Sequence, residues 1–248
     1  MRALLLYNEN GTIQPRIETL PEDRLPEGDL LLEVHYSSLN YKDALAVTGK
    51  GKIIRGDYPF VPGIDLVGTV LESENPDIRP GQTVIVTGWG IGESHWGGYA
   101  TRARVRSEWV VPLPRRLTPL EAMSIGTAGF TAMLSVMALE EHGLIPDQGE
   151  VVVTGASGGV GSLAVAILAH LGYEVVASTG KASAHGLLQA LGAARVIDRQ
   201  ELGQGPKRPL DAGRWAGAVD TVGGPTLAAL LSQIKRHGSV AACGLAQS

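Results

Sequence analysis

Residues 150–161 constrain the fold of this chain more than any other stretch. They read EVVVTGASGGVG, a short β-branched apolar run followed by a glycine-rich turn, and a helical run then extends to Gly172. The apolar run is too short for a helix and predicts a buried strand. Within the turn, Ala156, Gly158 and Gly161 match the dinucleotide-binding fingerprint, with alanine in the first glycine place. The stretch therefore predicts a strand, a tight turn and a helix that hold a dinucleotide.

Each part of this turn has a physical role in such a site. Gly158 lets the backbone come close to a pyrophosphate, and Gly161 lets the helix lie against the strand. The helix N-terminus offers free N–H groups and a partial positive charge to the phosphates. The alternative is a glycine-rich turn that only packs a strand against a helix. The position of the glycines between a strand and a helix favours the cofactor site.

The end of the next strand, after residues 174–177, indicates which dinucleotide is bound. An NAD site usually places an acidic residue there to hold the ribose 2′-hydroxyl. This chain instead has the hydroxyls of Ser178 and Thr179 and the ammonium of Lys181. These groups suit a 2′-phosphate, which a carboxylate would repel, and Arg199 at the end of the third strand supplies a second cation. We therefore expect NADPH, although Lys181 as a simple cap of a solvated turn is the alternative.

Composition limits the class of protein and its partners. The chain has 248 residues, 44% hydrophobic and 19% charged, which is typical of a globular protein with one large or two ordinary domains. A net charge of −4 gives no general attraction to nucleic acid or to an anionic membrane, so we expect neither partner. We expect no signal peptide and no stretch that could span a bilayer. A single cysteine, Cys243, indicates a reducing compartment, and we expect a cytoplasmic protein.

Two domains are expected, and the fold class is α/β. Residues 1–115 hold short strands between turns, which predicts a partly open β-barrel with one short helix at residues 40–47. Residues 116–248 begin with a capping box from Thr118 to Glu121 and then alternate strand and helix, which predicts a Rossmann nucleotide-binding domain. The expected strands are residues 2–7, 29–37, 61–70, 83–86, 104–105, 150–154, 173–178, 194–198, 216–220 and 238–243. The expected helices of the second domain are residues 118–141 with a break near Gly126 and Gly129, and residues 160–171, 181–191 and 225–236.

Tyr41 is the candidate catalytic residue. It lies in the polar stretch Asn40–Asp43, and its hydroxyl could donate a proton or a hydrogen bond to a substrate oxyanion. A partly buried tyrosine with an ordinary partner is the alternative. Asp43 and Asp65 could orient the site, but we expect each to cap a turn. We also expect His35 to be structural, and Trp89, His95 and Trp96 to cover the barrel rather than line a pocket.

No metal site is expected. A structural zinc site needs four cysteine or histidine ligands at short spacings. One cysteine and six scattered histidines cannot supply them. Hydride chemistry on this chain therefore cannot depend on a thiolate-bound zinc.

Five motifs spread over the whole chain resemble the medium-chain dehydrogenase/reductase superfamily, in its zinc-independent quinone-oxidoreductase branch. The resemblance is closest to the bacterial NADPH-dependent acryloyl-CoA reductase subfamily. The motifs are SLNYKD at residues 38–43, PGIDLVG at 62–68, VTGASGGVG at 153–161, WAGAVDTVGG at 215–224 and ACGLA at 242–246. Zinc-dependent members continue the Pro-Gly segment with His-Glu, whereas this chain has Ile64 and Asp65, so the metal ligand is absent.

The resemblance implies a GroES-like catalytic domain, a homodimer of the full-length protein and reduction of an activated carbon–carbon double bond. The implied reaction places hydride on the β-carbon of acryloyl-CoA and a proton on its α-carbon, which gives propionyl-CoA through an enolate-like oxyanion. From the resemblance and the residues together, the expected NADPH contacts are Tyr41, Ala156, Ser157, Gly158, Gly159, Val160, Ser178, Thr179, Gly180, Lys181, Arg199 and Leu245.

The length of this chain differs from that of the family. Members of the family continue past residue 248, so we expect this sequence to be truncated at its C-terminus. A short-chain dehydrogenase is rejected, because no tyrosine in this chain has a lysine four residues later. A quinone reductase on the same fold and an NADPH-binding protein without enzymatic activity both stay open.

Overall fold

The computed structural model describes residues 1–205 and 211–246, and it divides into two compact units, residues 1–127 and 128–248. The division falls within helix α2 (Pro119–Glu141), later than residue 115, where the sequence pattern changes from strands to helices. The first turns of α2 belong to unit 1 because Asp65 of that unit accepts a hydrogen bond from the backbone N–H of Thr127, at 3.0 Å.

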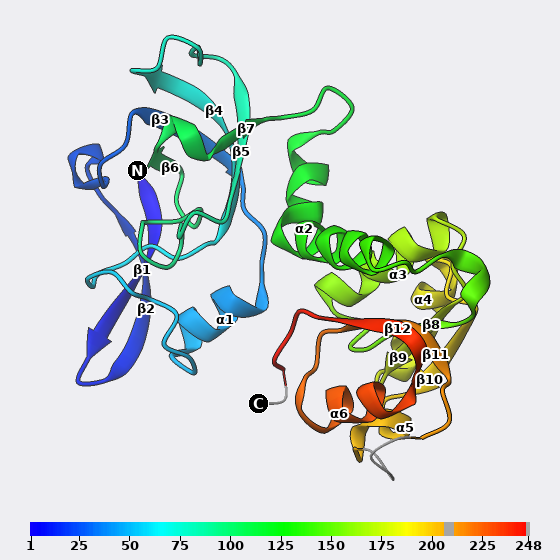
Figure 1. The fold of residues 1–248 in the computed structure, drawn as a ribbon. Coiled ribbons are helices and arrows are strands. Elements are labelled where there is room, and N and C mark those ends of the chain that lie inside the picture. Colours follow the sequence, from blue (N-terminus) through cyan, green and yellow to red (C-terminus); the bar gives the residue numbers. More distant parts are fainter. Residues whose placement is uncertain (206–210, 247–248) are drawn as a thin grey trace. The chain divides into compact units, whose positions relative to one another are not determined.

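Unit 1 is built from antiparallel strands. Its main sheet has the order β6–β3–β4–β5–β7, so β6 and β7 form the two edges, and β1 pairs with β2 in a separate hairpin. Bridges from Ala3 to Ala100 and from Leu6 to Phe60 join this hairpin to other parts of the unit. The predicted partly open arrangement of short strands is confirmed (Figure 1). The elements are β1 (Arg2–Glu9), β2 (Thr12–Thr19), η1 (Glu22–Arg24), β3 (Leu30–Tyr36), α1 (Tyr41–Thr48), β4 (Asp65–Ser73), β5 (Thr83–Thr87), β6 (Arg102–Val105), η2 (Ser107–Trp109) and β7 (Val110–Pro112).

Unit 2 is a parallel sheet with helices on both faces. The strand order β10–β9–β8–β11–β12 reverses between β8 and β11, which is the arrangement of a doubly wound sheet and confirms the predicted Rossmann fold. Its elements beyond α2 are η3 (Pro146–Gln148), β8 (Val151–Val153), α3 (Gly159–His170), β9 (Val175–Thr179), η4 (Ala182–Ala184), α4 (His185–Ala190), β10 (Arg195–Asp198), α5 (Gln200–Gly203), β11 (Trp215–Asp220), α6 (Gly224–Gln233) and β12 (Ile234–Ala242).

The alternation of side chains along β8 explains the two layers of helices. Val151 and Val153 point to one face, where they pack with residues of α2, α3 and α4. Val152 points to the other face and packs with residues of α5 and α6. Figure 1 shows α3 and α4 on one side of this sheet and α5 and α6 on the other. Because both faces are covered, the strand is apolar throughout, which is the pattern the sequence displayed.

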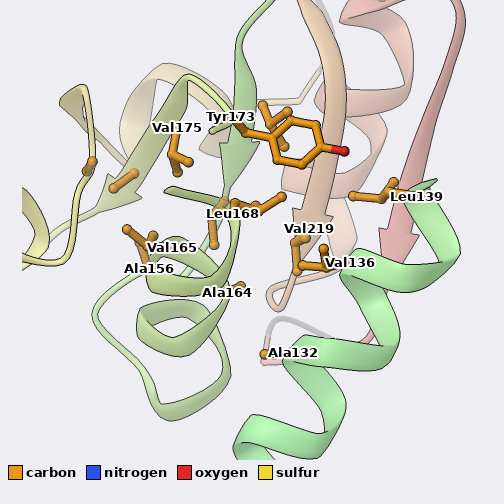
Figure 2. Packing of buried hydrophobic residues seen from close by; sticks show 14 of the residues in the cluster. Ala132, Val136, Leu139, Ala156, Ala164, Val165, Leu168, Tyr173, Val175 and Val219 are labelled. Atoms are coloured by element: carbon orange, nitrogen blue, oxygen red, sulfur yellow. The ribbon is translucent and has the colours of Figure 1, made fainter. Parts of the chain in front are cut away.

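Close packing on the first face holds α3 against the sheet. Figure 2 shows Val165 and Leu168 of α3 beside Val175 and Val219 of the strands, with Val136 of α2 completing the layer. Leu168 is fully buried. The glycine turn that precedes α3 is therefore fixed by a large apolar core at the other end of the helix.

Helix α2 differs from the expectation that no stretch of this chain is long and apolar enough to span a bilayer. Among the described residues it is the one helix long and apolar enough to cross a membrane by length and composition. Gly126, with φ 46° and ψ −155°, interrupts it, so the predicted break is confirmed. After the break, Ala132, Val136 and Leu139 are buried in unit 2. These features are those of a core helix, which passes the same test of length and composition.

One strand was not predicted, and two predicted helices differ in their bounds. The strand β2 was not predicted, because Pro15 and a largely polar composition hide it. The helix predicted to reach residue 236 ends at Gln233, and residues 234–236 belong to β12, which pairs in parallel with β11. The helix predicted over residues 181–191 is a 3-10 turn followed by the short α4.

Candidate cofactor site

A cavity of about 890 Å³ opens at the carboxyl ends of the strands of unit 2. This is where open α/β sheets bind ligands, beside the point at which the strand order reverses. The cavity is lined by loops that follow all five strands. The lining residues are Thr154, Gly155, Ser157, Ser178, Thr179, Gly180, Lys181, Arg199, Gln200, Gln204, Val222, Thr226 and Ala246.

The glycine turn brings helix α3 close to strand β8. A Cβ on Gly161 would collide with the carbonyl oxygen of Gly155 and would lie 2.7 Å from the Cα of Ala156, so only glycine fits there. The N–H of Ala156 donates to the carbonyl of Ser178 at 3.0 Å, which ties this turn to the end of β9. Gly158 is the N-cap of α3 and has no side chain to occupy the helix N-terminus. The turn therefore offers backbone N–H groups to an anion.

Hydroxyls and cations form the rim of the cavity. The Oγ atom of Ser157 lies 2.9 Å from Oγ1 of Thr179, and Oγ1 of Thr179 also accepts the backbone N–H of Lys181 at 3.2 Å. Ser178 and Thr179 are buried, whereas Lys181 and Arg199 are exposed to solvent. No aspartate or glutamate occurs among the described residues that line the cavity. The lining therefore carries the positive charges of Lys181 and Arg199 and no carboxylate.

The loop after β11, which contributes Val222 to the cavity lining, is held by a buried carboxylate whose hydrogen bonds are satisfied. Asp220 is fully buried, and it accepts the hydroxyl of Thr154 at 2.5 Å and the N–H groups of Gly223 at 2.9 Å and Val222 at 3.3 Å. These bonds fix the loop after β11. Thr154, Val222 and Thr226 also line the cavity, although no role was predicted for them. Nothing in their residue types indicates that they reach it.

The expected cofactor residues divide into two groups. Ser157, Ser178, Thr179, Gly180, Lys181 and Arg199 line the cavity together, as their predicted strand ends imply. Ala156, Gly158, Gly159 and Val160 belong to the same turn but are not part of the lining. Leu245 is 75% exposed and lies next to Ala246, which does line the cavity.

Tyr41 belongs to the other compact unit, where it opens helix α1. Its side chain is 65% exposed. The backbone before it is fixed, because the carboxylate of Asp43 accepts the N–H of Asn40 at 2.9 Å in a capping arrangement. The hydroxyl of Tyr41 is thus presented to solvent from a rigid helix start.

Two buried carboxylates support this helix start. Burial raises the pKa of Asp43, which also accepts the N–H of Ile64 at 3.0 Å. Asp65 accepts the Nδ2 of Asn40 at 3.0 Å, the hydroxyl of Ser38, and the N–H and hydroxyl of Thr127 at 3.0 and 2.5 Å. Asp43 caps the start of α1 rather than a turn, and Asp65 joins segments that are far apart in sequence.

The two histidines and two tryptophans of unit 1 that the sequence singles out differ in their surroundings. His35 lies with Nε2 2.7 Å from Oγ1 of Thr69. His95 packs edge-on against Trp109, with ring centroids 5.0 Å apart, and burial lowers its pKa. Trp96 is partly buried in the barrel, whereas Trp89 is exposed and does not cover it. Within residues 1–205 and 211–246, no three His, Cys, Asp or Glu side chains gather in a way that could hold a metal ion.

The fold and the site define a class of oxidoreductases. Residues 26–115 match the family described as Alcohol dehydrogenase GroES-like domain, and residues 159–248 match the family described as Zinc-binding dehydrogenase. The chain belongs to the medium-chain dehydrogenase/reductase superfamily, among the proteins similar to quinone oxidoreductases.

Particular relatives narrow this class. The chain is 58% identical over 246 residues to Probable acrylyl-CoA reductase AcuI of Escherichia coli (strain K12), covering 99% of this chain and 75% of that protein. The solved structure of the yhdH oxidoreductase from Salmonella enterica in complex with NADP is 57% identical, with a TM-score of 0.95 over 99% of this chain and 75% of that one. Bacillus subtilis protein yhfP with NAD bound is 46% identical, with a TM-score of 0.91 over 96% of this chain and 72% of that one. The curated name of the last protein is "Putative quinone oxidoreductase YhfP".

Proposed function

We propose that this chain binds NADPH in the cavity of unit 2 and reduces an activated carbon–carbon double bond, with acryloyl-CoA as substrate and propionyl-CoA as product. The observation that carries the proposal is the rim, where two hydroxyls and two cations meet without an acidic residue. Similarity to a reductase named for acrylyl-CoA and to a structure with bound NADP supports the same assignment.

The residues of the cavity fit this cofactor. Lys181 and Arg199 contribute two positive charges to the lining, which would attract a ribose 2′-phosphate, and an acidic residue that would repel it is absent from the described lining. The turn before α3 leaves room for a pyrophosphate because its glycines carry no side chain. The fit argues for NADPH over NADH, and the relative with NAD bound makes this preference a point to test.

The proposed reaction adds a hydride to one carbon of the double bond and a proton to the other. NADPH, when bound, supplies the hydride that the β-carbon of the substrate receives. The protein would stabilise the enolate-like oxyanion of the thioester and let a proton reach the α-carbon. Tyr41 is the proposed donor to that oxyanion, since its hydroxyl is presented from the rigid start of α1. No metal ion is needed for either part.

A quinone reductase is the second candidate, favoured by the name of the Bacillus subtilis relative. Both reactions deliver hydride to an electron-poor unsaturated system, so the cofactor site does not separate them. The test is to follow NADPH consumption with acryloyl-CoA and with a benzoquinone under the same conditions. A kcat/KM at least about tenfold higher for acryloyl-CoA supports the proposal, whereas the reverse ranking assigns the chain to quinone reduction. NADPH binding with no turnover of either compound indicates a binding protein without enzymatic activity.

We further propose an oligomeric state and a cellular location for the protein. A homodimer in the cytoplasm agrees with the family and with the single cysteine, Cys243. Sedimentation of the purified chain tests the oligomeric state, and a monomer at all concentrations contradicts it. Cell fractionation tests the location.

A further inference from the structure

Arg199 and Gly180 lie against each other at the rim of the cavity. Strands β9 and β10 are parallel neighbours in which Thr179 pairs with Asp198, so the two residues follow the last pair on adjacent strands. The backbone N–H of Arg199 donates to the carbonyl of Thr179 at 3.1 Å. This bond fixes the start of the arginine side chain relative to Gly180. Both residues line the cavity.

Only a residue without a side chain fits at position 180 while Arg199 keeps this conformation. A Cβ on Gly180 would lie 2.7 Å from both Cδ and Nε of Arg199, and 3.2 Å from Cγ. Carbon atoms in contact are about 3.5–4.0 Å apart, so the arginine would have to move. The φ angle of Gly180 lies outside the left-handed region, so the requirement for glycine is steric rather than conformational.

We infer that Gly180 is a positioning residue that sets the cofactor specificity of this site through Arg199. The arginine stem lies along the glycine backbone, and this holds a long side chain with many rotamers where it faces the cavity. The inference rests on the proposed function, which assigns Arg199 to the 2′-phosphate. A side chain at position 180 displaces the guanidinium and weakens NADPH binding. NADH has no 2′-phosphate, so its binding does not depend on this contact.

A double-mutant cycle tests the inference by isothermal titration of NADPH and of NADH into the purified chain. Arg199→Ala is expected to weaken NADPH binding about 10- to 100-fold, because it removes a charge-assisted contact to phosphate. Gly180→Ala is expected to weaken NADPH about 5- to 10-fold and to leave NADH within about twofold. In the Arg199→Ala background, Gly180→Ala is expected to cause no further loss.

The matched control is Gly186→Ala. A Cβ at Gly186 in α4 meets nothing within 4 Å, so this change adds the same methyl group to the same unit without displacing Arg199. Both cofactors should bind the control as they bind the unmodified chain. An unchanged midpoint of thermal unfolding without ligand in every variant is the check that the unit is folded.

Each failure has a distinct meaning. The inference is overturned if Gly180→Ala weakens NADPH binding equally with and without Arg199, or if it leaves NADPH binding unchanged. In either case a loss of NADPH binding in Arg199→Ala still supports the proposed site. Equal loss of NADPH and NADH in Gly180→Ala assigns the glycine to close approach of the shared part of the cofactor and also overturns it. Arg199→Ala with unchanged NADPH preference overturns the 2′-phosphate assignment itself, and with it the role of Gly180.

Discussion

Removal of the Asp65 carboxylate is expected to destabilise unit 1 strongly. Asp65 is fully buried and accepts four hydrogen bonds from three residues in two segments of the chain. Two of the four donors are hydroxyls, which can rotate toward other acceptors. The other two are the backbone N–H of Thr127 and the Nδ2 of Asn40, which also donates to Oγ of Ser38 at 2.8 Å and to Oδ2 of Asp43 at 3.1 Å.

The magnitude follows from the hydrogen bonds that are lost. A hydrogen bond to a charged group contributes about 1.5–3 kcal/mol, so loss of the bonds from Asn40 and Thr127 in Asp65→Ala should lower the free energy of unfolding by about 3–6 kcal/mol. Asp65→Asn keeps one oxygen for both N–H donors, and its NH₂ group can donate to the hydroxyl of Thr127. The asparagine variant loses only the charge and should cost about 1 kcal/mol. The difference between the two variants isolates the hydrogen bonds.

Urea denaturation followed by tryptophan fluorescence measures this difference, because Trp89, Trp96 and Trp109 all lie in unit 1. The transition midpoint should fall in the order wild type, Asp65→Asn, Asp65→Ala, with an unchanged m-value. Asp57→Ala, at an exposed position of the same unit, is the control and should shift nothing. Equal effects of alanine and asparagine, or a loss below about 1 kcal/mol for alanine, would refute the reasoning.

Three further predictions concern the cofactor, the reaction and pH. Lys181→Glu should weaken NADPH by at least about tenfold more than NADH, measured by equilibrium titration, because it places a negative charge at the rim. Tyr41→Phe should lower kcat with acryloyl-CoA by about tenfold or more while NADPH affinity changes little, because it removes a donor and keeps the ring. The paired hydrogen bonds from Arg195, at 2.7 and 2.9 Å, lower the pKa of Glu150, so their contribution is complete above the ordinary value near 4.5 and is lost as the pH falls through the lowered value. Arg195→Met should therefore flatten the acid limb of the stability curve, measured as the urea midpoint against pH.

Opposite results would be equally clear. Parallel loss of both cofactors in the Lys181 variant would indicate damage to the fold rather than to phosphate recognition. Unchanged turnover in the Tyr41 variant would return that residue to a packing or cofactor-contact role. An acid limb of unchanged slope in the Arg195 variant would show that Glu150 is not stabilised by this pair.

The parallel sheet and the cofactor turn could be predicted because local sequence determines both. Val151 to Val153 form an uninterrupted apolar strand, and the glycine spacing before α3 leaves few other conformations. The polar rim followed from the rule that parallel strands end at one edge, which places Ser178 and Arg199 together. Such rules need only the order of elements along the chain.

Features that depend on contacts between distant segments could not be predicted. The four hydrogen bonds to Asp65 form only when the fold brings residues 38–40 and Thr127 close to it, and nothing in the residue types predicts this. The switch from α6 to β12 at Ile234 depends on pairing with β11, which overrides a sequence compatible with a longer helix. The fit of Arg199 over Gly180 is likewise visible only when two strand ends are placed side by side.

Thermal unfolding with NADPH, with NADH at the same concentration and with no ligand tests the central claim most directly. NADPH at about 100 times its dissociation constant should add about 2.7 kcal/mol of stability, and NADH bound about 100-fold more weakly should add about 0.4 kcal/mol. A clear rise in the midpoint with NADPH and a small one with NADH is the predicted result. Equal shifts with both cofactors, or a larger shift with NADH, would contradict recognition of a 2′-phosphate by this cavity.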